Sequence, residues 1–549
     1  MAGIQVGLSY MPGMKMRPRP TGLSSRDNLE KRLNEEKQMT TMEQPLFGAS
    51  SDNFDQWETI RWVAIEKNVK RLQMRIAKAT REGRHNRARA LQWLLTHSHD
   101  AKLLAVRRVT SNTGAKTPGV DHVTWSRSKQ KLEAAYNMRR SGYQPKPLRR
   151  IYIPKKNGQE RPLGIPTMED RAQQALHLLA LEPISETKAD PHSYGFRPER
   201  SAADAIARCF HLLCRRKASP RWILEGDIKA CFDEISHEWL TTHIPMDSVV
   251  LSKWLKAGFV EQNTLYPTNA GTPQGGIISP TLANMTLDGL EEAAIKAAPK
   301  GGKVNVVRYA DDFIVTGISR KILERQVLPA IKAFLRKRGL RISPRKTKIT
   351  RIDDGFDFLG FNVRKYKGKL LIKPYKKNVT SFLDKAREII KTHSDKSVEL
   401  MILRLNSQIR GWANYFRYVV SKKAFNYVDG SIFASLMLWA KRRHNQKTAQ
   451  WRYEKYFRRR KMLSWVFFTK VKDKNREIKF LDLLHARDVP IVRHIGIRAQ
   501  TNPYDPAYQE YFERRRFAKN RPSIDPSKVI NLEEELIANV CGRAAKAAF

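Results

Sequence analysis

Two adjacent carboxylates between two short apolar runs constrain this chain more than any other feature. Residues 307–315 read VRYADDFIV. The apolar residues on either side predict two short strands, and Asp311 and Asp312 fall at the turn between them. Neighbouring carboxylates repel each other and resist burial unless a cation lies between them. Asp is also a common turn residue, so the stretch alone fits a divalent-metal site and an ordinary turn equally well.

The charge of the chain points to its partner. The 549 residues include 102 Lys and Arg against 54 Asp and Glu, a formal net charge of +48. Such an excess favours a polyanion, because neutralised phosphates release their counterions on binding. An anionic membrane is the competing interpretation. No stretch approaches the ~20 apolar residues of a spanning helix, so we expect nucleic acid and no membrane.

The cysteines and the N-terminus bear on the compartment. The four cysteines (Cys209, Cys214, Cys231 and Cys541) form no CxxC pair, and no paired histidines accompany them. We therefore expect neither a zinc site nor a disulfide framework, and a reduced, intracellular chain. The N-terminus has no apolar signal core, which makes a cytoplasmic protein the expectation. Its first twenty residues are basic and lack acids, so an organellar transit peptide is the alternative.

The hydrophobic pattern divides the chain into six regions. Residues 1–50 are polar and predict a poorly ordered leader with a short helix around 27–35. Apolar steps of three and four over 51–115 predict a helical extension with a basic outer face. Strand and helix patterns alternate over 116–375, and two apolar stripes predict a helical bundle over 376–445. A basic region (446–520) and a tail (521–549) follow.

A basic run interleaved with aromatic residues spans the boundary between the regions 376–445 and 446–520. Residues 441–461 hold ten Lys and Arg against one acid, Glu454, interleaved with Trp451, Tyr453, Tyr456 and Phe457. Bases stack on rings while cations hold the phosphates, so the run predicts a nucleic-acid groove.

A third carboxylate completes a candidate catalytic set. Asp227 ends the predicted strand 222–227, 84 residues before Asp311. Two-metal phosphoryl transfer needs carboxylates that bridge two cations about 3.5–4 Å apart. Asp227, Asp311 and Asp312 supply them if their strands lie side by side. Lys155 and Arg161 flank an Asn-Gly hairpin turn, which is either simply exposed or able to close over phosphates.

Arranged in order, the motifs of this chain resemble those of group II intron-encoded reverse transcriptases, also called maturases, over roughly residues 54–515. The resemblance implies an α+β fold: a right-hand polymerase whose fingers and palm (116–375) contain an antiparallel palm sheet, then an α-helical thumb or maturase domain (376–445). It also implies a basic C-terminal DNA-binding region over 446–520, in which HARDVPIVRHIGIRAQTNPYDPAYQEYF (485–512) resembles the part linked to DNA target recognition. The motifs that carry the resemblance are LRRIYIPKKNGQERPLGIPTMEDRAQQAL (148–176), SYGFRP (193–198), GDIKACFDEISH (226–237), GTPQGGIISPTLANMTLDGLE (271–291), VRYADDFIV (307–315), PRKTKI (344–349), FDFLGF (356–361) and IRGWANYFRYVVSKKAFNYVDGSIFASLMLWAKRRH (409–444).

The resemblance also implies roles for single residues. It makes Asp227, Asp311 and Asp312 the metal-binding aspartates, with the backbone of Ile228 as a further ligand and two Mg²⁺ in the active site. Phe232 takes the place of the ring that excludes a 2′-hydroxyl. The implied nucleotide contacts are Gln274 at the sugar, Arg161 and Lys155 at the triphosphate, and Lys346 near the departing pyrophosphate. Simple surface exposure is the alternative for the three basic residues.

The implied function is that of an RNA-directed DNA polymerase and splicing cofactor. Such a protein binds its intron RNA, assists splicing, stays on the excised lariat, supports reverse splicing into target DNA (retrohoming) and copies the RNA with deoxynucleoside triphosphates. Two alternatives are a splicing-only maturase with an inactive polymerase and a reverse transcriptase with a host role but no intron. The resemblance implies a protein of the bacterial cytoplasm. The candidate RNA contacts in the thumb are Arg410, Arg417, Lys422, Lys423, Arg442 and Arg443.

The chain departs from many relatives after residue 515. They end in an HNH-type endonuclease with paired cysteines and clustered histidines, whereas this stretch holds one cysteine, Cys541, and no histidine. We therefore expect no cleavage of the second DNA strand, so that another source, such as a nascent strand at a replication fork, would prime cDNA synthesis.

Overall fold

The computed structural model describes residues 57–154, 158, 160–216, 218–393, 397–460, 463–472 and 477–519. The predicted leader (1–50) with its helix at 27–35 and the predicted tail (521–549) lie outside these residues, and so does Lys155. Within the described part of the chain, no helix is long and apolar enough to cross a membrane.

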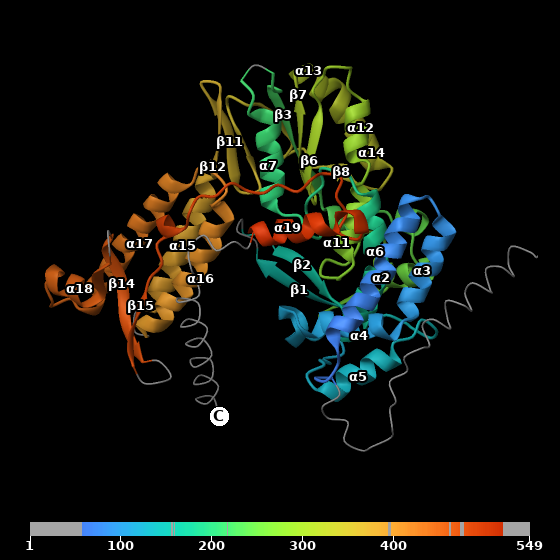
Figure 1. Ribbon diagram of the computed structural model, residues 1–549, viewed down its shortest axis with the longest axis horizontal. Helices are drawn as coiled ribbons and strands as arrows, with labels where there is room; N and C mark the ends of the chain where they lie inside the picture. Colours follow the sequence, from blue (N-terminus) through green and yellow to red (C-terminus); the bar gives the residue numbers. More distant parts are fainter. Residues whose placement is uncertain are drawn as a thin grey trace, which may run out of the picture. The chain divides into compact units, whose positions relative to one another are not determined.

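Helices build the N-terminal part of the described chain. The residues with the predicted three-and-four period form α2 (Trp62–Arg81), α3 (His85–His97) and α4 (His99–Thr110). All three pack against the long helix α6 (Met168–Lys188), which is buried along most of its length (Figure 1). Their shared apolar side chains form a core of their own. The short elements η1 (Thr113–Lys116) and α5 (Ser128–Asn137) follow α4.

A five-stranded antiparallel sheet holds the candidate carboxylates. Its strand order is β6-β7-β3-β8, with β9 also paired to β3. Neighbouring residues of β3 point to opposite faces, so Ile223 enters one core with α7 and Leu224 enters another with α9, α10 and α11. The strands are β3 (Trp222–Lys229), β6 (Asn305–Tyr309), β7 (Asp312–Gly317), β8 (Arg341–Ile342) and β9 (Lys348–Arg351).

The helices around this sheet are mostly short. After Asp227 we predict one helix carrying Phe232 and Leu240, but the structure has two, because Ile235 is extended and the Ser236 side chain accepts a hydrogen bond from the N–H of Trp239, which caps a new helix. The helices are α7 (Ala202–Leu213), α8 (Cys231–Glu234), α9 (His237–His243), α10 (Ser248–Leu255), α11 (Ser279–Leu287), α12 (Leu290–Lys296), α13 (Arg320–Ile322), η2 (Leu323–Val327) and α14 (Leu328–Arg336).

Two smaller sheets flank this body. The first has the strand order β2-β1-β4-β5 and contains the predicted hairpin, whose second strand carries Arg161. The second is a meander of three antiparallel strands over 356–374. The strands are β1 (Leu148–Pro154), β2 (Glu160–Ile165), β4 (Phe259–Glu261), β5 (Thr264–Tyr266), β10 (Phe356–Phe358), β11 (Phe361–Tyr366) and β12 (Lys369–Pro374). The prediction of a mixed helix and sheet fold is therefore confirmed.

The C-terminal part combines a helical bundle with a third small sheet. The two predicted apolar stripes lie on α16 (Val398–Phe416) and α17 (Lys422–Arg443), which pack with α15 (Lys376–Thr392) in one core. The sheet consists of β13 (Phe457–Arg460), β14 (Leu463–Lys472) and β15 (Ile478–Asp482), and α18 (Ala449–Tyr456) precedes it.

The predicted groove of mixed bases and rings over 441–461 is partly wrong. Tyr456 and Phe457 are only 6% and 3% exposed and pack against Phe467 of β14. These two residues therefore belong to the core. The prediction failed for them because aromatic residues every few positions are typical of a buried helix face as well as of a stacking surface. Trp451 and Tyr453 are half-buried.

After β15 the chain turns back toward α6 and α7. We call residues 489–519 the return segment; it contains η4 (Pro506–Tyr508) and α19 (Gln509–Lys519), and η3 (Ala486–Asp488) precedes it. Arg515 donates to Asp204 of α7 over 2.6 Å, and Asn502 donates to Thr187 of α6 over 2.9 Å. Figure 1 shows α19 beside these helices rather than beside the C-terminal sheet.

Candidate active site

The three aspartates meet at one end of the five-stranded sheet. Asp227 of β3 lies directly opposite Asp312 of β7, and Asp312 in turn pairs with Tyr309 of β6. Asp311 occupies the two-residue turn with Ala310, which has a φ of +56°. The strand before Asp227 thus lies beside the 307–315 hairpin, which is the condition for the three aspartates to share metal ions.

These carboxylates are electrostatically strained. Burial, together with the charges of Asp311 and Asp227, raises the pKa of Asp312 to about 6. Burial likewise raises the pKa of Asp311, with a contribution from Asp227. The ammonium of Lys346 lies 3.0 Å from both carboxylate oxygens of Asp227. One lysine against three carboxylates leaves negative charge uncompensated, and cations reduce that repulsion.

The donor set fits a hard divalent cation. Carboxylate oxygens with a neighbouring backbone carbonyl are the ligands that Mg²⁺ or Mn²⁺ takes. Among the described residues, however, no group of three His, Cys, Asp or Glu side chains is already arranged as a metal site. Lys346 instead bonds Asp227. Ile228, the predicted backbone ligand, follows Asp227 on β3 and pairs with Ile342.

A network of buried polar side chains holds the hairpin from behind. Arg308, 1% exposed, donates to the Asn284 amide oxygen over 3.0 Å and to Asp288 over 2.6 Å. Asn284 donates in turn to the carbonyl of Gly195 over 2.8 Å. A Cβ at Gly195 would lie 2.5 Å from the backbone nitrogen of Ala310, so only glycine allows this approach to the turn.

Sequence reasoning did not assign a role to these supporting residues. Gly195 lies in SYGFRP, Asn284 and Asp288 lie in the motif 271–291, and Arg308 lies in the hairpin stretch itself. Nothing local in these motifs indicates that they meet behind the hairpin. A glycine and an amide within apolar stretches were the available signal.

Two of the predicted nucleotide contacts, Arg161 and Gln274, form a chain of hydrogen bonds with Asp233. Arg161 of β2 donates to the amide oxygen of Gln274 over 2.8 Å. The Gln274 amide nitrogen donates to both carboxylate oxygens of Asp233, over 3.0 and 2.9 Å. This arrangement fixes the orientation of the Gln274 amide, with its oxygen toward Arg161 and its nitrogen toward Asp233. Asp233, which the sequence analysis missed, orients Gln274 and lies one residue after Phe232.

Phe232 lies on α8, half-buried, with its ring centroid 6.3 Å from that of Phe196 in an edge-to-face arrangement. Phe196 is 56% exposed and has a φ of +57°, unusual for a large exposed ring. It comes from SYGFRP, and the sequence analysis did not assign it a role.

The candidate RNA contacts are spread over the C-terminal bundle. Lys422 and Lys423 lie in the first turn of α17, and Arg442 and Arg443 lie in its last turn. A helix of 22 residues is about 33 Å long, so the two pairs cannot bind one phosphate. Lys422 donates to the carbonyl of Val489 over 3.3 Å, which ties it to the return segment.

The two remaining candidates belong to α16 and its end. Arg410 is half-buried on α16, and Arg417 at its C-cap donates to Asn414 over 3.3 Å. Contact of all six basic residues with RNA stays a prediction.

Three family models match this chain. The model described as reverse transcriptase (RNA-dependent DNA polymerase) matches residues 153–363. The model of the N-terminal domain of reverse transcriptase matches 57–138, and that of the group II intron maturase-specific domain matches 379–457.

Curated relatives match over long stretches. Protein YkfC of Escherichia coli is 34% identical over 297 residues, which cover 47% of this chain and 78% of the relative. The group II intron-encoded protein LtrA of Lactococcus lactis is 29% identical over 435 residues, covering 62% and 71%. An uncharacterized 91 kDa protein in the cob intron of Schizosaccharomyces pombe is 28% identical over 412 residues, covering 60% and 51%.

Proposed function

This chain belongs to the group II intron-encoded proteins, the reverse transcriptases that carry a maturase domain, and we propose that Asp227, Asp311 and Asp312 form its polymerase centre. The family is one of RNA-directed DNA polymerases that require a divalent cation. The match across 153–363 does not favour a splicing-only protein with an inactive polymerase. The observation that carries the proposal is the pairing of Asp227 with Asp312 beside the Asp311 turn.

The chemistry divides between the carboxylates and the basic side chains. When bound, two Mg²⁺ ions on the three aspartates and the Ile228 carbonyl would lower the pKa of the primer 3′-hydroxyl and stabilise the leaving pyrophosphate. Lys346 lies 3.0 Å from Asp227 and can turn from that carboxylate to donate to the pyrophosphate. Arg161 binds the triphosphate, and Gln274 contacts the sugar in the orientation that Asp233 imposes.

The rest of the chain brings RNA to this centre. In our proposal the region 116–375 forms fingers and palm, α15, α16 and α17 form the thumb and grip the intron RNA, and the basic region after them contacts target DNA. The formal charge of +48 supports a nucleic-acid partner on several surfaces at once. The protein would act in the bacterial cytoplasm as part of an intron ribonucleoprotein.

Primer extension tests the polymerase centre directly. The purified full chain should extend a DNA primer on an RNA template when Mg²⁺ and the four deoxynucleoside triphosphates are present, and chelation of the metal should stop it. Absence of extension at any Mg²⁺ or Mn²⁺ concentration, with a commercial reverse transcriptase active in parallel, would overturn the proposal.

Shortening Phe232 should relax sugar selection. We expect Phe232→Ala to raise the ratio of ribonucleotide to deoxynucleotide incorporation by about tenfold or more, because the ring that excludes the 2′-hydroxyl is gone. Single-nucleotide extension with each triphosphate measures the ratio. Phe210→Ala, which removes a ring 44% exposed on α7, is the matched control and should leave the ratio unchanged. An unchanged ratio for Phe232→Ala would remove the residue from the sugar site.

A further inference from the structure

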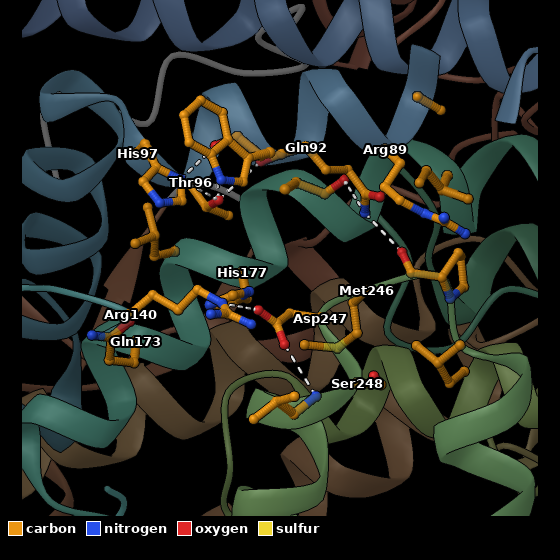
Figure 2. A pocket seen from close by; sticks show the side chains of 18 of the residues that line it. Arg89, Gln92, Thr96, His97, Arg140, Gln173, His177, Met246, Asp247 and Ser248 are labelled. Carbon is orange, nitrogen blue, oxygen red and sulfur yellow. Dashed lines mark hydrogen bonds and ion pairs between the residues drawn. The ribbon is translucent and has the colours of Figure 1, made fainter. Parts of the chain in front are cut away.

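A cavity lies among α3, α6 and the segment 241–249, and none of the polymerase residues lines it (Figure 2). Its volume is about 1050 Å³, ample for a nucleotide. The segment 241–249 contains the end of α9 and the start of α10, so the cavity joins the N-terminal helices to the body that holds the main sheet.

The cavity has a strong excess of positive charge. Arg89, Lys102, Arg139 and Lys188 line it, and none of them makes an ion pair with another residue in the described ranges. The pKa of Lys102 is lowered by burial and by the charge of Arg139, so these two cations are close enough to repel each other. Cations gathered without a counter-ion favour an anionic ligand.

The single carboxylate among the lining residues, Asp247, already has partners of its own. Asp247 forms an ion pair with Arg140 (Figure 2). It also accepts hydrogen bonds from the N–H groups of Val249 and Val250, over 3.0 and 3.2 Å, as the cap of α10. Asp247 therefore does not neutralise the four cations.

The same walls offer a flat apolar surface. Trp93 is 51% exposed and stacks on His97, with ring centroids 4.2 Å apart and 23° between the planes. Leu176 and Met246 add apolar area. An exposed indole over a cavity rich in cations is the combination that binds a base and its phosphate together.

A histidine supplies hydrogen-bonding groups at the wall formed by α6. His177 lines the cavity, and its ring makes no hydrogen bond to any other described residue. Burial lowers its pKa to about 4, so near pH 7 the ring is neutral and offers one donor and one acceptor. Figure 2 shows His177 beside Arg140 and Asp247, with His97 on the opposite helix.

We propose that this cavity is a second nucleotide site, separate from the polymerase centre, that stacks an unpaired base on Trp93 and holds its phosphate with Arg89, Lys102 and Arg139. His177 contacts the edge of the base. A free nucleotide and an extruded nucleotide of bound RNA share this chemistry.

Photocrosslinking of the full chain tests the site. The probes are an unstructured five-nucleotide RNA with one 4-thiouridine and, separately, 8-azido-AMP, both at elevated salt to suppress non-specific phosphate contacts. We expect crosslinks in peptides that contain Trp93 or His177. Arg89→Glu and Trp93→Ala should each reduce them about tenfold.

Arg87→Glu is the matched control, because Arg87 lies on the same helix, is exposed and does not line the cavity. It should leave crosslinking within about twofold, as a change of ±0.5 kcal/mol would. Crosslinks with the RNA alone identify RNA as the source, and crosslinks with both probes identify a site open to free nucleotides.

Two results would overturn the site: no crosslink near the cavity from either probe, or equal losses in Arg87→Glu and Arg89→Glu. Primer extension by the same preparations keeps the outcome distinct from that of the polymerase proposal, since all three variants should extend a primer at saturating template.

Discussion

Replacing Asp311 and Asp312 with asparagine should reduce primer extension by a factor of at least about 10³ while leaving the chain folded. The change preserves side-chain volume and removes two of the three carboxylates that face each other at the end of β3 and β7. Because those carboxylates repel each other, the variant should unfold at the same temperature as the wild type or higher when no divalent metal is present. Single-turnover extension and thermal unfolding in EDTA give the two measurements.

A matched control exists in the same chain. Asp353 and Asp354 are also adjacent, lie at the exposed turn after β9, and pair with none of the three aspartates. Asp353→Asn with Asp354→Asn should extend primers at nearly the wild-type rate. Substantial extension by the Asp311 and Asp312 variant would contradict the assignment, and so would a large loss of thermal stability in EDTA.

The polymerase centre was largely predictable because its signals are local. Alternating apolar residues on both sides of Asp311 predict the hairpin, and a strand that ends in Asp227 predicts the partner. The support behind it was not predictable. Gly195, Asn284 and Arg308 lie up to 113 residues apart and meet only because β6 packs between α11 and the SYGFRP turn.

The C-terminal region shows the same limit. Tyr456 and Phe457 have the spacing that a stacking surface and a buried face share, and only tertiary packing places them in the core. The return segment packs against α7 at a separation of 311 residues between Arg515 and Asp204. No periodicity within residues 489–519 reports such a contact.

That contact is a buried ion pair supported by several further hydrogen bonds. The side chains of Arg515 and Asp204 are 1% and 0% exposed. Arg515 also donates to the carbonyl of Glu199 over 2.7 Å, and His494 donates to Asp204 over 2.8 Å. Burial opposes ionisation of Asp204, but the hydrogen bond and charge of His494, with the charge of Arg515, lower its pKa below the ordinary value.

The lowered pKa fixes the sign of the pH dependence. A carboxyl group whose pKa falls on folding stabilises the protein fully above its unfolded-state pKa, which is about 3.9 for Asp. The contribution is lost as the pH falls below that value toward the folded pKa. At pH 7 the contribution of the Asp204 carboxylate is therefore fully present, and that is the pH for comparing variants.

Breaking the pair from one side should loosen the return segment. We expect Arg515→Met to cost about 3–5 kcal/mol, because it leaves the Asp204 carboxylate buried with fewer partners. Arg516→Met, the neighbour with a 54% exposed side chain, should cost less than about 0.5 kcal/mol. Limited proteolysis should cut the Arg515→Met chain within 489–519 before it cuts the rest of the chain.

The double variant Asp204→Leu with Arg515→Leu distinguishes the loss of the ion pair from the change in side-chain size. Recovery toward wild-type stability means that the unpaired charge caused the loss, whereas additive losses of the two substitutions would contradict it.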